Sequence, residues 1–383
     1  MKKLFTSESV GRGHPDKVCD QISDAILDSY LTLDPHAKVA IETLASGNMI
    51  VIAGEVKSNV DIDVIEIAKN LLRELGYYSY KTSIIVDIKE QSSDINQGVE
   101  LGEQNGQELG AGDQGIMFGY ATNETPQYMP LAIMLANEIV KIADKYRVNG
   151  KFKWAKADMK SQVTLDYTNP QQTKIDTILF SVQHSAKYNK EQFEDFIKNC
   201  VLAEAVQKYN LALPDKLLIN PTGNFVIGGP LGDTGLTGRK IIVDTYGGAA
   251  RHGGGAFSGK DATKMDRSGA YAARWIAKNI VAAGLADRVE IQIAYSIGLA
   301  QVVSIMVECF GTNKVDVNLI EQAVEQLFDL TPKGIINALD LRKPKFFETS
   351  YYGHFGRDEV DFTWERLDRV EQLKEFIARH QTK

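Results

Sequence analysis

Cysteine is scarce in this sequence, with three residues among 383, and they stand far apart at positions 19, 200 and 309. That spacing offers neither a C-x-x-C metal pair nor a disulfide framework. Long apolar runs are also missing: the longest, residues 131–136, is well short of the ~20 residues that a membrane span needs. No apolar segment follows Lys2 and Lys3, so no secretory signal is expected. These absences indicate a cytoplasmic protein without a membrane partner.

An excess of positive charge is absent too, because 50 Asp and Glu outnumber 43 Lys and Arg and give a formal net charge of -7. A chain of this charge is not expected to coat DNA or RNA nonspecifically, so we expect no nucleic-acid partner. The length suits two or three domains of roughly 100–200 residues each. Glycine is abundant instead, with 32 residues, and much of it is clustered.

Three passages of the chain repeat one order of expected elements: strand, helix, strand, strand, helix, strand. In the first passage, apolar residues recur every four positions from Val18 to Tyr30 on one helix face, and residues 46–48 (SGN) are a hairpin signal between two β-rich runs. The order predicts an α+β protein with three similar β-α-β-β-α-β domains. The alternative is coincidence, since this order is common.

The expected elements follow from the same patterns. The first passage has a strand at 4–7, a helix from 16, strands at 38–44 and 49–56, a helix capped by Ser58 or Asn59 that ends at Gly76, and a strand at 83–88. The middle passage has strands at 116–120, 162–167, 175–183 and 217–219, and helices at 129–146 and 190–209. The last has strands at 240–246, 289–295 and 302–310, helices at 262–283 and 317–328, and no clear closing strand.

The domains are expected at 1–100, 112–226 and 228–370, joined by a loop at 97–111. This loop is polar and punctuated by glycine, with little periodicity. A loop of this length is usually a lid or a disordered segment, and a lid is expected here. Asp113 follows it within the segment GAGDQG, residues 110–115. Asp113 is either a turn residue or a ligand for an ammonium group.

The most informative segment is residues 238–267, where six Lys and Arg stand against three Asp, so the local charge is +3 in a chain of -7. Glycines let backbone N–H groups approach an anion, and the cations offset its charge, so a polyphosphate is the expected ligand. The run from Gly254 to Lys260 almost spells a phosphate-binding P-loop, but Asp261 replaces the required Ser or Thr and the preceding strand ends too early. A plain surface loop would explain the glycines but not the cations.

A second segment, GHPDK at residues 13–17, stands just ahead of the first helix. A helix N-terminus favours anions. Asp16 is either an ordinary helix-start carboxylate or a ligand for Mg²⁺, which favours one or two carboxylates plus substrate phosphates. Further Asp residues follow at 20, 24 and 28. Like charges four residues apart cost roughly 0.2–0.5 kcal/mol per pair, so partners or a metal are expected for some of them.

Together these motifs resemble the S-adenosylmethionine synthetase (methionine adenosyltransferase) family. The resemblance covers essentially the whole chain in the right order. It is carried by GHPDK at 13–17, GAGDQG at 110–115, INPTG at 219–223, GLTGRKIIVDTYGG at 235–248, GGGAFSGKD at 253–261 and YGHFGR at 352–357.

The resemblance implies three similar α+β domains and synthesis of S-adenosylmethionine from ATP and L-methionine. The methionine sulfur would attack C5′ of ATP, and water would then cut the bound triphosphate into phosphate and pyrophosphate. Such chemistry needs positioning of an uncharged nucleophile and stabilisation of charge on the leaving group. Mg²⁺ with ATP and K⁺ are the implied cofactors. Family sites lie between two subunits, which implies a homodimer at least, with a homotetramer expected.

The resemblance also implies a role for individual residues. Those on ATP are His14, Asp158 near the ribose, Lys160, Phe225 on adenine, Asp233, Arg239, Lys240, Ala256 and Lys260, with His14, Lys160, Arg239, Lys240 and Lys260 as the catalytic set. Those on methionine are Glu55, Gln97, Asp113, Asp233 and Lys264. The metal ligands are Asp16 and Asp266 for Mg²⁺ and Glu42 for K⁺. Without this resemblance, Glu42, Glu55 and Gln97 would be interpreted as surface residues of strands or loops.

Two departures from the family pattern stand out. Gly11 and Arg12 replace Ser-Glu ahead of the GHPD motif, a charge reversal two residues from His14, and Asn224 stands where Arg is frequent. A nucleotide-binding regulatory subunit that has lost catalysis is one competing hypothesis, favoured only by Arg12. A P-loop small-molecule kinase is another, opposed by Asp261.

Overall fold

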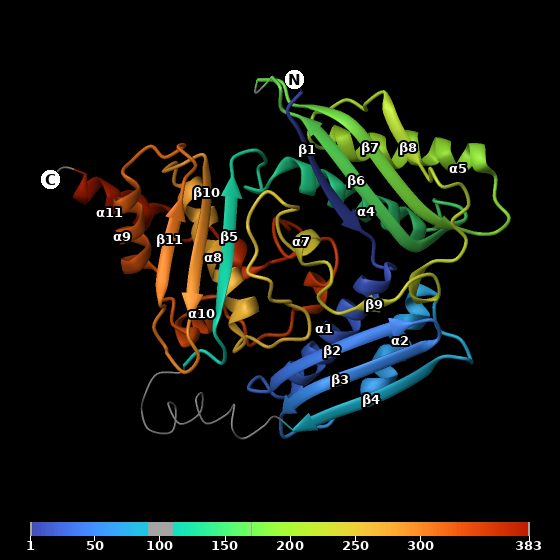
Figure 1. The fold of residues 1–383 in the computed structure, drawn as a ribbon, viewed down its shortest axis with the longest axis horizontal. Helices are drawn as coiled ribbons and strands as arrows, with labels where there is room; N and C mark the ends of the chain where they lie inside the picture. Colours follow the sequence, from blue (N-terminus) through green and yellow to red (C-terminus); the bar gives the residue numbers. More distant parts are fainter. Residues whose placement is uncertain (1, 91–109, 170, 382–383) are drawn as a thin grey trace.

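The computed structural model describes residues 2–90, 110–169 and 171–381. The predicted lid lies outside the described residues except for 110 and 111. The described elements form three β-sheets with helices packed against them (Figure 1). This arrangement confirms the predicted α+β class. Within these ranges, the helices are too short or too polar to span a membrane.

The first sheet has the strand order β4-β3-β2-β9 and packs against α1 and α2. Side chains of β2 alternate between buried and more exposed, as expected for a sheet with one covered face. β2 and β3 run antiparallel, and β3 and β4 run parallel. The bounds are β2 Lys38–Ser46, β3 Met49–Lys57, β4 Ser83–Glu90, β9 Gly235–Leu236, α1 Pro15–Leu33 and α2 Val64–Leu75.

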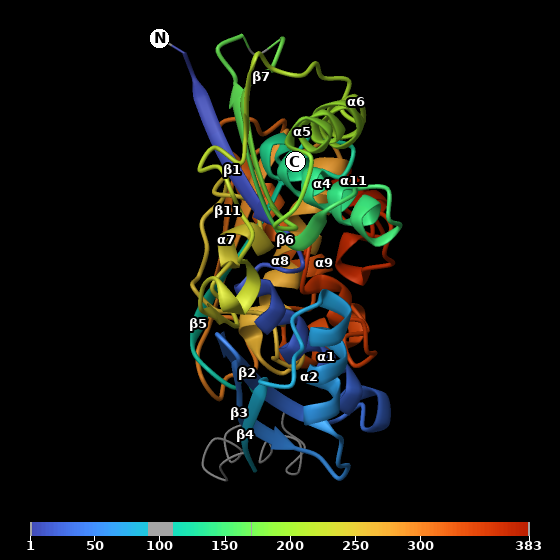
Figure 2. The ribbon, with the colours of Figure 1, turned by 90° about the vertical axis from the view of Figure 1, so that its right-hand side faces the viewer.

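The second sheet has the order β1-β6-β7-β8 and packs against α4, and the third has the order β11-β10-β5 and packs against α8. Figure 2 shows the second sheet above the first sheet, with α4 beside it. The bounds are β1 Leu4–Val10, β5 Gly115–Thr122, β6 Ala155–Asp166, β7 Lys174–His184, β8 Lys216–Ile219, β10 Arg288–Tyr295, β11 Ser304–Glu308, α4 Leu131–Val148 and α8 Met265–Ala282.

The opening strand of each passage lies in the sheet of another passage. β1 precedes α1 but pairs with β6, and β5 precedes α4 but pairs with β10. β9 precedes α8 but pairs with β2, which closes the cycle. A passage expressed by itself would therefore lack the strand that another passage contributes to its sheet.

Three predicted elements were wrong or differ in form. Residues 240–246 are not a strand, because Ile241–Asp244 form the helical turn α7. Their β-branched side chains favour a strand, but tertiary contacts decide. The Asp244 carboxylate binds the Lys17 ammonium, and the Asp244 carbonyl accepts the N–H of His354 at 2.9 Å.

Ser58 and Asn59 do not cap α2. The N-cap is Asp63, whose Oδ1 accepts the N–H of Glu66 at 2.9 Å, whereas the Ser58 hydroxyl donates to Asp34 at 2.7 Å. The predicted helix at 190–209 is split by a π-helical turn, and helices rather than a closing strand follow β11 in the described residues. These bounds are α5 Lys190–Phe196, the π turn Ile197–Leu202, α6 Ala203–Gln207, α9 Val317–Leu327, α10 Pro332–Ala338 and α11 Val370–His380.

Arg274 of α8 ties the third sheet to the C-terminal segment. Its side chain is fully buried. The guanidinium donates to both carboxylate oxygens of Glu365, at 3.0 and 2.9 Å, and to the carbonyls of Tyr120 and Tyr128 at 2.8 and 2.9 Å. A buried charge with this many partners fixes the helix, the strand and the turn in one arrangement.

Arg274→Met should lower the free energy of unfolding by about 3–5 kcal/mol, because it breaks a buried ion pair and leaves carbonyls unpaired. The control is Lys374→Met on α11, which removes an exposed pair with Glu371 and should leave stability nearly unchanged. Urea unfolding followed by circular dichroism measures both. Equal midpoints for the two variants would contradict the buried role of Arg274.

Candidate active site

The first turn of α1 places His14 beside Asp16. His14 is the N-cap, and its Nδ1 accepts the backbone N–H of Asp16 at 3.2 Å. Burial, followed by the charge of Lys240, lowers the pKa of His14 to about 4, so the imidazole is neutral near pH 7. Since Nδ1 accepts a hydrogen bond, the proton of the neutral ring is on Nε2. His14 thus keeps one N–H available for a ligand.

A pocket of about 240 Å³ opens beside this turn. Strand β6 contributes Asp158 and Lys160 to its wall. Burial raises the pKa of Asp158 to about 7, although Asp158 accepts the N–H of Gly229 at 2.8 Å. The pocket therefore brings together five of the predicted ATP residues, His14, Asp158, Lys160, Phe225 and Asp233.

Asp16 holds two of the predicted cations at the start of α1. The Nζ of Lys240 lies 2.5 Å from Asp16 Oδ2, and the Nε of Arg239 lies 3.7 Å from Asp16 Oδ1. Oδ1 also accepts the N–H of Leu236 at 3.0 Å. Burial alone would raise the pKa of Asp16, but Lys240 and this N–H outweigh it and hold the pKa below its usual value. The carboxylate is therefore ionised near neutral pH.

The glycine-rich loop before α8 carries a second cluster of charges. The Nζ of Lys260 lies 2.7 Å from Asp266 Oδ2, and the Nζ of Lys264 lies 3.0 Å from Asp261 Oδ2. Each of these two lysines, predicted to bind phosphate or methionine, is thus paired with a nearby carboxylate, Asp266 in the first turn of α8 or Asp261 in the loop. A bound anion would have to compete with these carboxylates for the lysines.

The two charge clusters meet where Gly238 packs against Ala256. Gly238 has a φ of +77°, and a Cβ at this position would lie 2.2 Å from the Cβ of Ala256. A distance this short is not tolerated, so any other residue at 238 would push the two segments apart. The glycine permits the segment of Arg239 and Lys240 to lie against the glycine-rich loop.

Three of the remaining predicted residues, Glu42, Glu55 and Asp113, do not line the pocket of His14. Glu42 of β2 and Glu55 of β3 share one face of the first sheet, the face turned from α1. Asp113 is exposed, and its Oδ1 accepts the N–H of Gln114 at 2.7 Å, as a turn residue does. Gln97 lies outside the described residues.

Sequence reasoning missed the partners of a buried charge network beneath the site. Lys17 contacts Asp20 at 2.9 Å and also binds Asp244, and Arg267 donates to both oxygens of Asp24 at 2.8 and 2.9 Å. The one signal was the four-residue spacing of the acidic side chains on α1, which predicted partners or a metal. In the described structure the partners are cations and backbone N–H groups.

Arg12, the charge that departs from the family pattern, lies outside the pocket of His14. Its guanidinium is 2.8 Å from Glu74, donates to Gln21 at 2.9 Å and lies 4.7 Å from the ring centre of Tyr351. The charge reversal is therefore balanced by these neighbours and does not enter the pocket.

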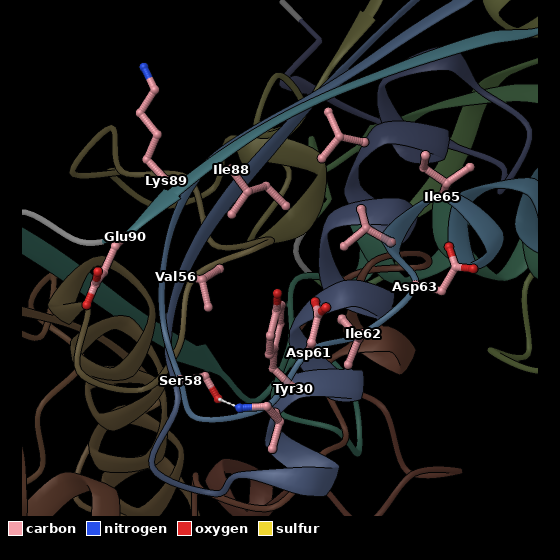
Figure 3. Close-up of a pocket in the computed structure, with 13 residues that line it drawn as sticks. Tyr30, Val56, Ser58, Asp61, Ile62, Asp63, Ile65, Ile88, Lys89 and Glu90 are labelled. Carbon is pink, nitrogen blue, oxygen red and sulfur yellow. Dashed lines mark hydrogen bonds between the residues drawn. The ribbon is translucent and has the colours of Figure 1, made fainter.

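A larger pocket, of about 610 Å³, is lined by none of the predicted site residues (Figure 3). Val56 and Ile88, from neighbouring strands of the first sheet, line it together with Tyr30 of α1 and the segment 60–65. Its charged side chains are three acidic ones, Asp61, Asp63 and Glu90, and one basic one, Lys89. A polyphosphate is not expected to bind there.

Asp16 and Asp266 suit Mg²⁺ by their chemistry. Among residues 2–90, 110–169 and 171–381, no three His, Cys, Asp or Glu side chains gather into a site that could hold a metal ion by themselves. Mg²⁺ does not require such a cage, because it is commonly held by one or two carboxylates and the oxygens of a phosphate ligand. Two single carboxylates, each beside a lysine that the sequence predicts to bind phosphate, fit that pattern.

Comparison with known families covers nearly the whole chain. Residues 2–97 match the N-terminal domain of S-adenosylmethionine synthetase, residues 108–225 the central domain and residues 227–366 the C-terminal domain. Proteins named S-adenosylmethionine synthase are similar over 98% of this chain. That of Mycoplasmopsis synoviae is 65% identical, over 98% of its own length, and that of Mycoplasma capricolum 55%, over 97%. That of Clostridium botulinum is 51% identical over its full length. The chain therefore belongs to the S-adenosylmethionine synthetase family.

Proposed function

We propose that the chain makes S-adenosylmethionine from ATP and L-methionine in two steps, attack of the methionine sulfur on C5′ of ATP and hydrolysis of the bound triphosphate to phosphate and pyrophosphate. That the chain is a methionine adenosyltransferase follows from its family and from its relatives. The observation that best supports the two steps is the gathering of cations at the start of α1, where Lys240 lies 2.5 Å from Asp16 beside the pocket of His14.

ATP is proposed to lie in the pocket with its triphosphate toward these cations. Phe225 would contact the adenine and Asp158 the ribose, while His14 Nε2–H and Lys160 donate to phosphate oxygens. The position of Lys160 supports this role, because Lys160 stands opposite Val10 of β1, four residues before His14. Arg239, Lys240, Lys260, Asp233 and Ala256 complete the proposed ATP site.

The first step forms a bond from sulfur to C5′ and breaks the bond from C5′ to oxygen. The electron pair of the broken bond leaves with the triphosphate, and the sulfur becomes a positive sulfonium. The nucleophile is uncharged, so the chain need only position it. Preorganised cations offset the charge that develops on the leaving oxygen. In the second step water adds to a phosphorus atom, and the P–O bond to the remaining pyrophosphate breaks.

Two metals are part of the proposal. Asp16 and Asp266 would hold Mg²⁺, which would offset the negative charge of the phosphates. Glu42 would hold K⁺, a cation that carboxylate oxygens suit. The ion pairs of Asp16 with Lys240 and of Asp266 with Lys260 would then open, and both lysines would turn to the phosphates. The free lysines are what the triphosphate requires.

Methionine is proposed to bind through Glu55, Gln97, Asp113, Asp233 and Lys264. A carboxylate for its ammonium group and a lysine for its carboxylate are what a zwitterion requires. Of the four that lie within the described residues, Asp233 lines the pocket of His14 and the other three do not. This separation supports a site completed by a second copy of the chain, hence a homodimer at least, with pairs assembling into a homotetramer. The proposed location is the cytoplasm, and the lid at 97–111 would close the site.

Purified chain given ATP, Mg²⁺, K⁺ and L-methionine should release S-adenosylmethionine, phosphate and pyrophosphate in equal amounts, with almost no release when methionine is omitted. Lys260→Met should stay folded and lose about 10²–10³ in rate, the usual effect of removing one preorganised donor. Chromatography of the products and circular dichroism of the variant provide the readouts. Formation of ADP in place of triphosphate products would contradict the proposal.

Asp16→Asn should raise the Mg²⁺ concentration needed for half-maximal rate, because a neutral amide is a poorer ligand for a hard cation than a carboxylate. The matched control is Asp63→Asn, a carboxylate at the start of α2 that caps the helix away from the site. Magnesium titrations of the steady-state rate compare the two variants with the parent. If all three curves superimpose, Asp16 is only a helix-start residue.

The buried carboxyl of Asp158 predicts how the stability of the fold depends on pH. Its pKa is about 7 in the folded chain because of burial, against 3.8 for the free group. The folded state therefore becomes less stable as pH rises from about 4 through 7, because the carboxyl loses its proton in the unfolded chain but keeps it in the folded chain. Asp158→Asn removes that loss, so its melting temperature relative to the parent should rise with pH in this window.

Asp166→Asn is the control for this measurement. Asp166 is on the same strand, and its hydrogen bonds to Thr168 lower its pKa instead. Thermal melts at pH 4 to 8 should show no rise with pH for this variant. A flat difference for Asp158→Asn as well would mean that Asp158 is ionised throughout.

A further inference from the structure

Helix α1 carries four carboxylates at four-residue steps, and each one accepts a backbone N–H from another segment. We call these residues the acidic ladder; they are Asp16, Asp20, Asp24 and Asp28. The N–H donors are Leu236 to Asp16 at 3.0 Å, Gly238 to Asp20 at 2.9 Å, Gly259 to Asp24 at 2.8 Å, and Phe346 and Phe347 to Asp28 at 3.0 and 2.8 Å.

The spacing of the ladder matches the chain that lies along it. Four residues of an α-helix rise about 6 Å, and two residues of extended chain span roughly 6.6 Å. Leu236 and Gly238 are two residues apart and therefore meet consecutive carboxylates. Thr237, which stands between Leu236 and Gly238, has its hydroxyl 2.9 Å from that of Ser23, three residues after Asp20 on α1. The segment 236–238 is thus held in one register on α1.

The two middle carboxylates are buried and held by cations that do not line the pocket of His14. Asp20 and Asp24 have no exposed surface. Lys17 binds Asp20 at 2.9 Å, and Arg267 binds both oxygens of Asp24. A buried carboxylate with every partner in place has little freedom to move. The N–H groups that these carboxylates accept are fixed with the same rigidity.

Gly238 directly precedes Arg239 and Lys240, and Gly259 directly precedes Lys260. We propose that Asp20 and Asp24 are positioning residues, which set the distance between these two groups of cations so that both reach one triphosphate. They do not touch the substrate themselves. This inference rests on the function proposed above, because it takes the three cations as the triphosphate clamp.

The fourth carboxylate of the ladder serves as an internal control. Asp28 is on the same helix and also accepts backbone N–H groups, but its donors, Phe346 and Phe347, precede no residue assigned to the site. If the carboxylates of the acidic ladder contributed only to stability, replacing Asp28 and replacing Asp20 would have the same effect on the reaction.

The test compares Asp20→Asn and Asp24→Asn with Asp28→Asn. Each change keeps the shape of the side chain and removes a charged acceptor. Two test variants keep the experiment decisive if one of them does not fold; Asp20→Asn is the safer, because Lys17 retains Asp244 as a partner. Thermal melts first define a temperature at which the variants are folded. The KM for ATP, the KM for methionine, kcat and inhibition by tripolyphosphate are then measured there.

We expect Asp20→Asn and Asp24→Asn to lower kcat/KM for ATP by about 10–10²-fold, the scale of a misplacement of roughly 1 Å. Inhibition by tripolyphosphate should weaken with it, while the KM for methionine stays near that of the parent. Asp28→Asn should change the melting temperature only.

Equal kinetics for all three folded variants, or an equal rise in both KM values, would overturn the positioning role. A parent chain that makes no S-adenosylmethionine would instead overturn the proposed function.

Discussion

The burial of carboxylates along one face of α1 is the constraint on which the rest of the structure depends. Asp20 and Asp24 have no exposed surface, and an ionised group so placed is costly unless it is paired and hydrogen-bonded. Lys17, Arg267 and the N–H groups of two glycines supply the pairing. The helix therefore depends on the loops beside it, and β2 holds the same loops, because Thr237 donates its N–H to the Thr43 carbonyl and Asp261 to the Val39 carbonyl, each at 3.0 Å. Fold and site depend on the same contacts.

The exchange of opening strands between passages brings the ATP residues together. β1 pairs with β6 and leads directly into α1, so Lys160 stands opposite Val10 and close to His14. β9 pairs with β2 and lies along α1, which delivers Arg239 and Lys240 to Asp16. Segments more than 140 residues apart in sequence thus converge because neither sheet is complete without its borrowed strand.

The sequence allowed prediction of what local patterns determine. The helix from Asp16, the hairpin at residues 46–48 and the cation-rich glycine loop have signals within a few residues, and each has its expected form in the structure. The helical turn at Ile241–Asp244 was missed because contacts with Lys17 and His354 override the strand propensity of its side chains. The ladder was visible as spacing, but its donors lie more than 200 residues away in the sequence, and no local rule pairs them.

Amide hydrogen exchange tests most directly whether one helix fixes the site segments. Peptides that cover 235–240 and 257–261 can be compared with α1 and with the exposed loop at 297–303 in the ligand-free protein. The account predicts that the amides of Gly238 and Gly259 exchange as slowly as the core of α1, because their N–H groups are bonded to buried carboxylates. Exchange as fast as that of the loop at 297–303 would contradict it.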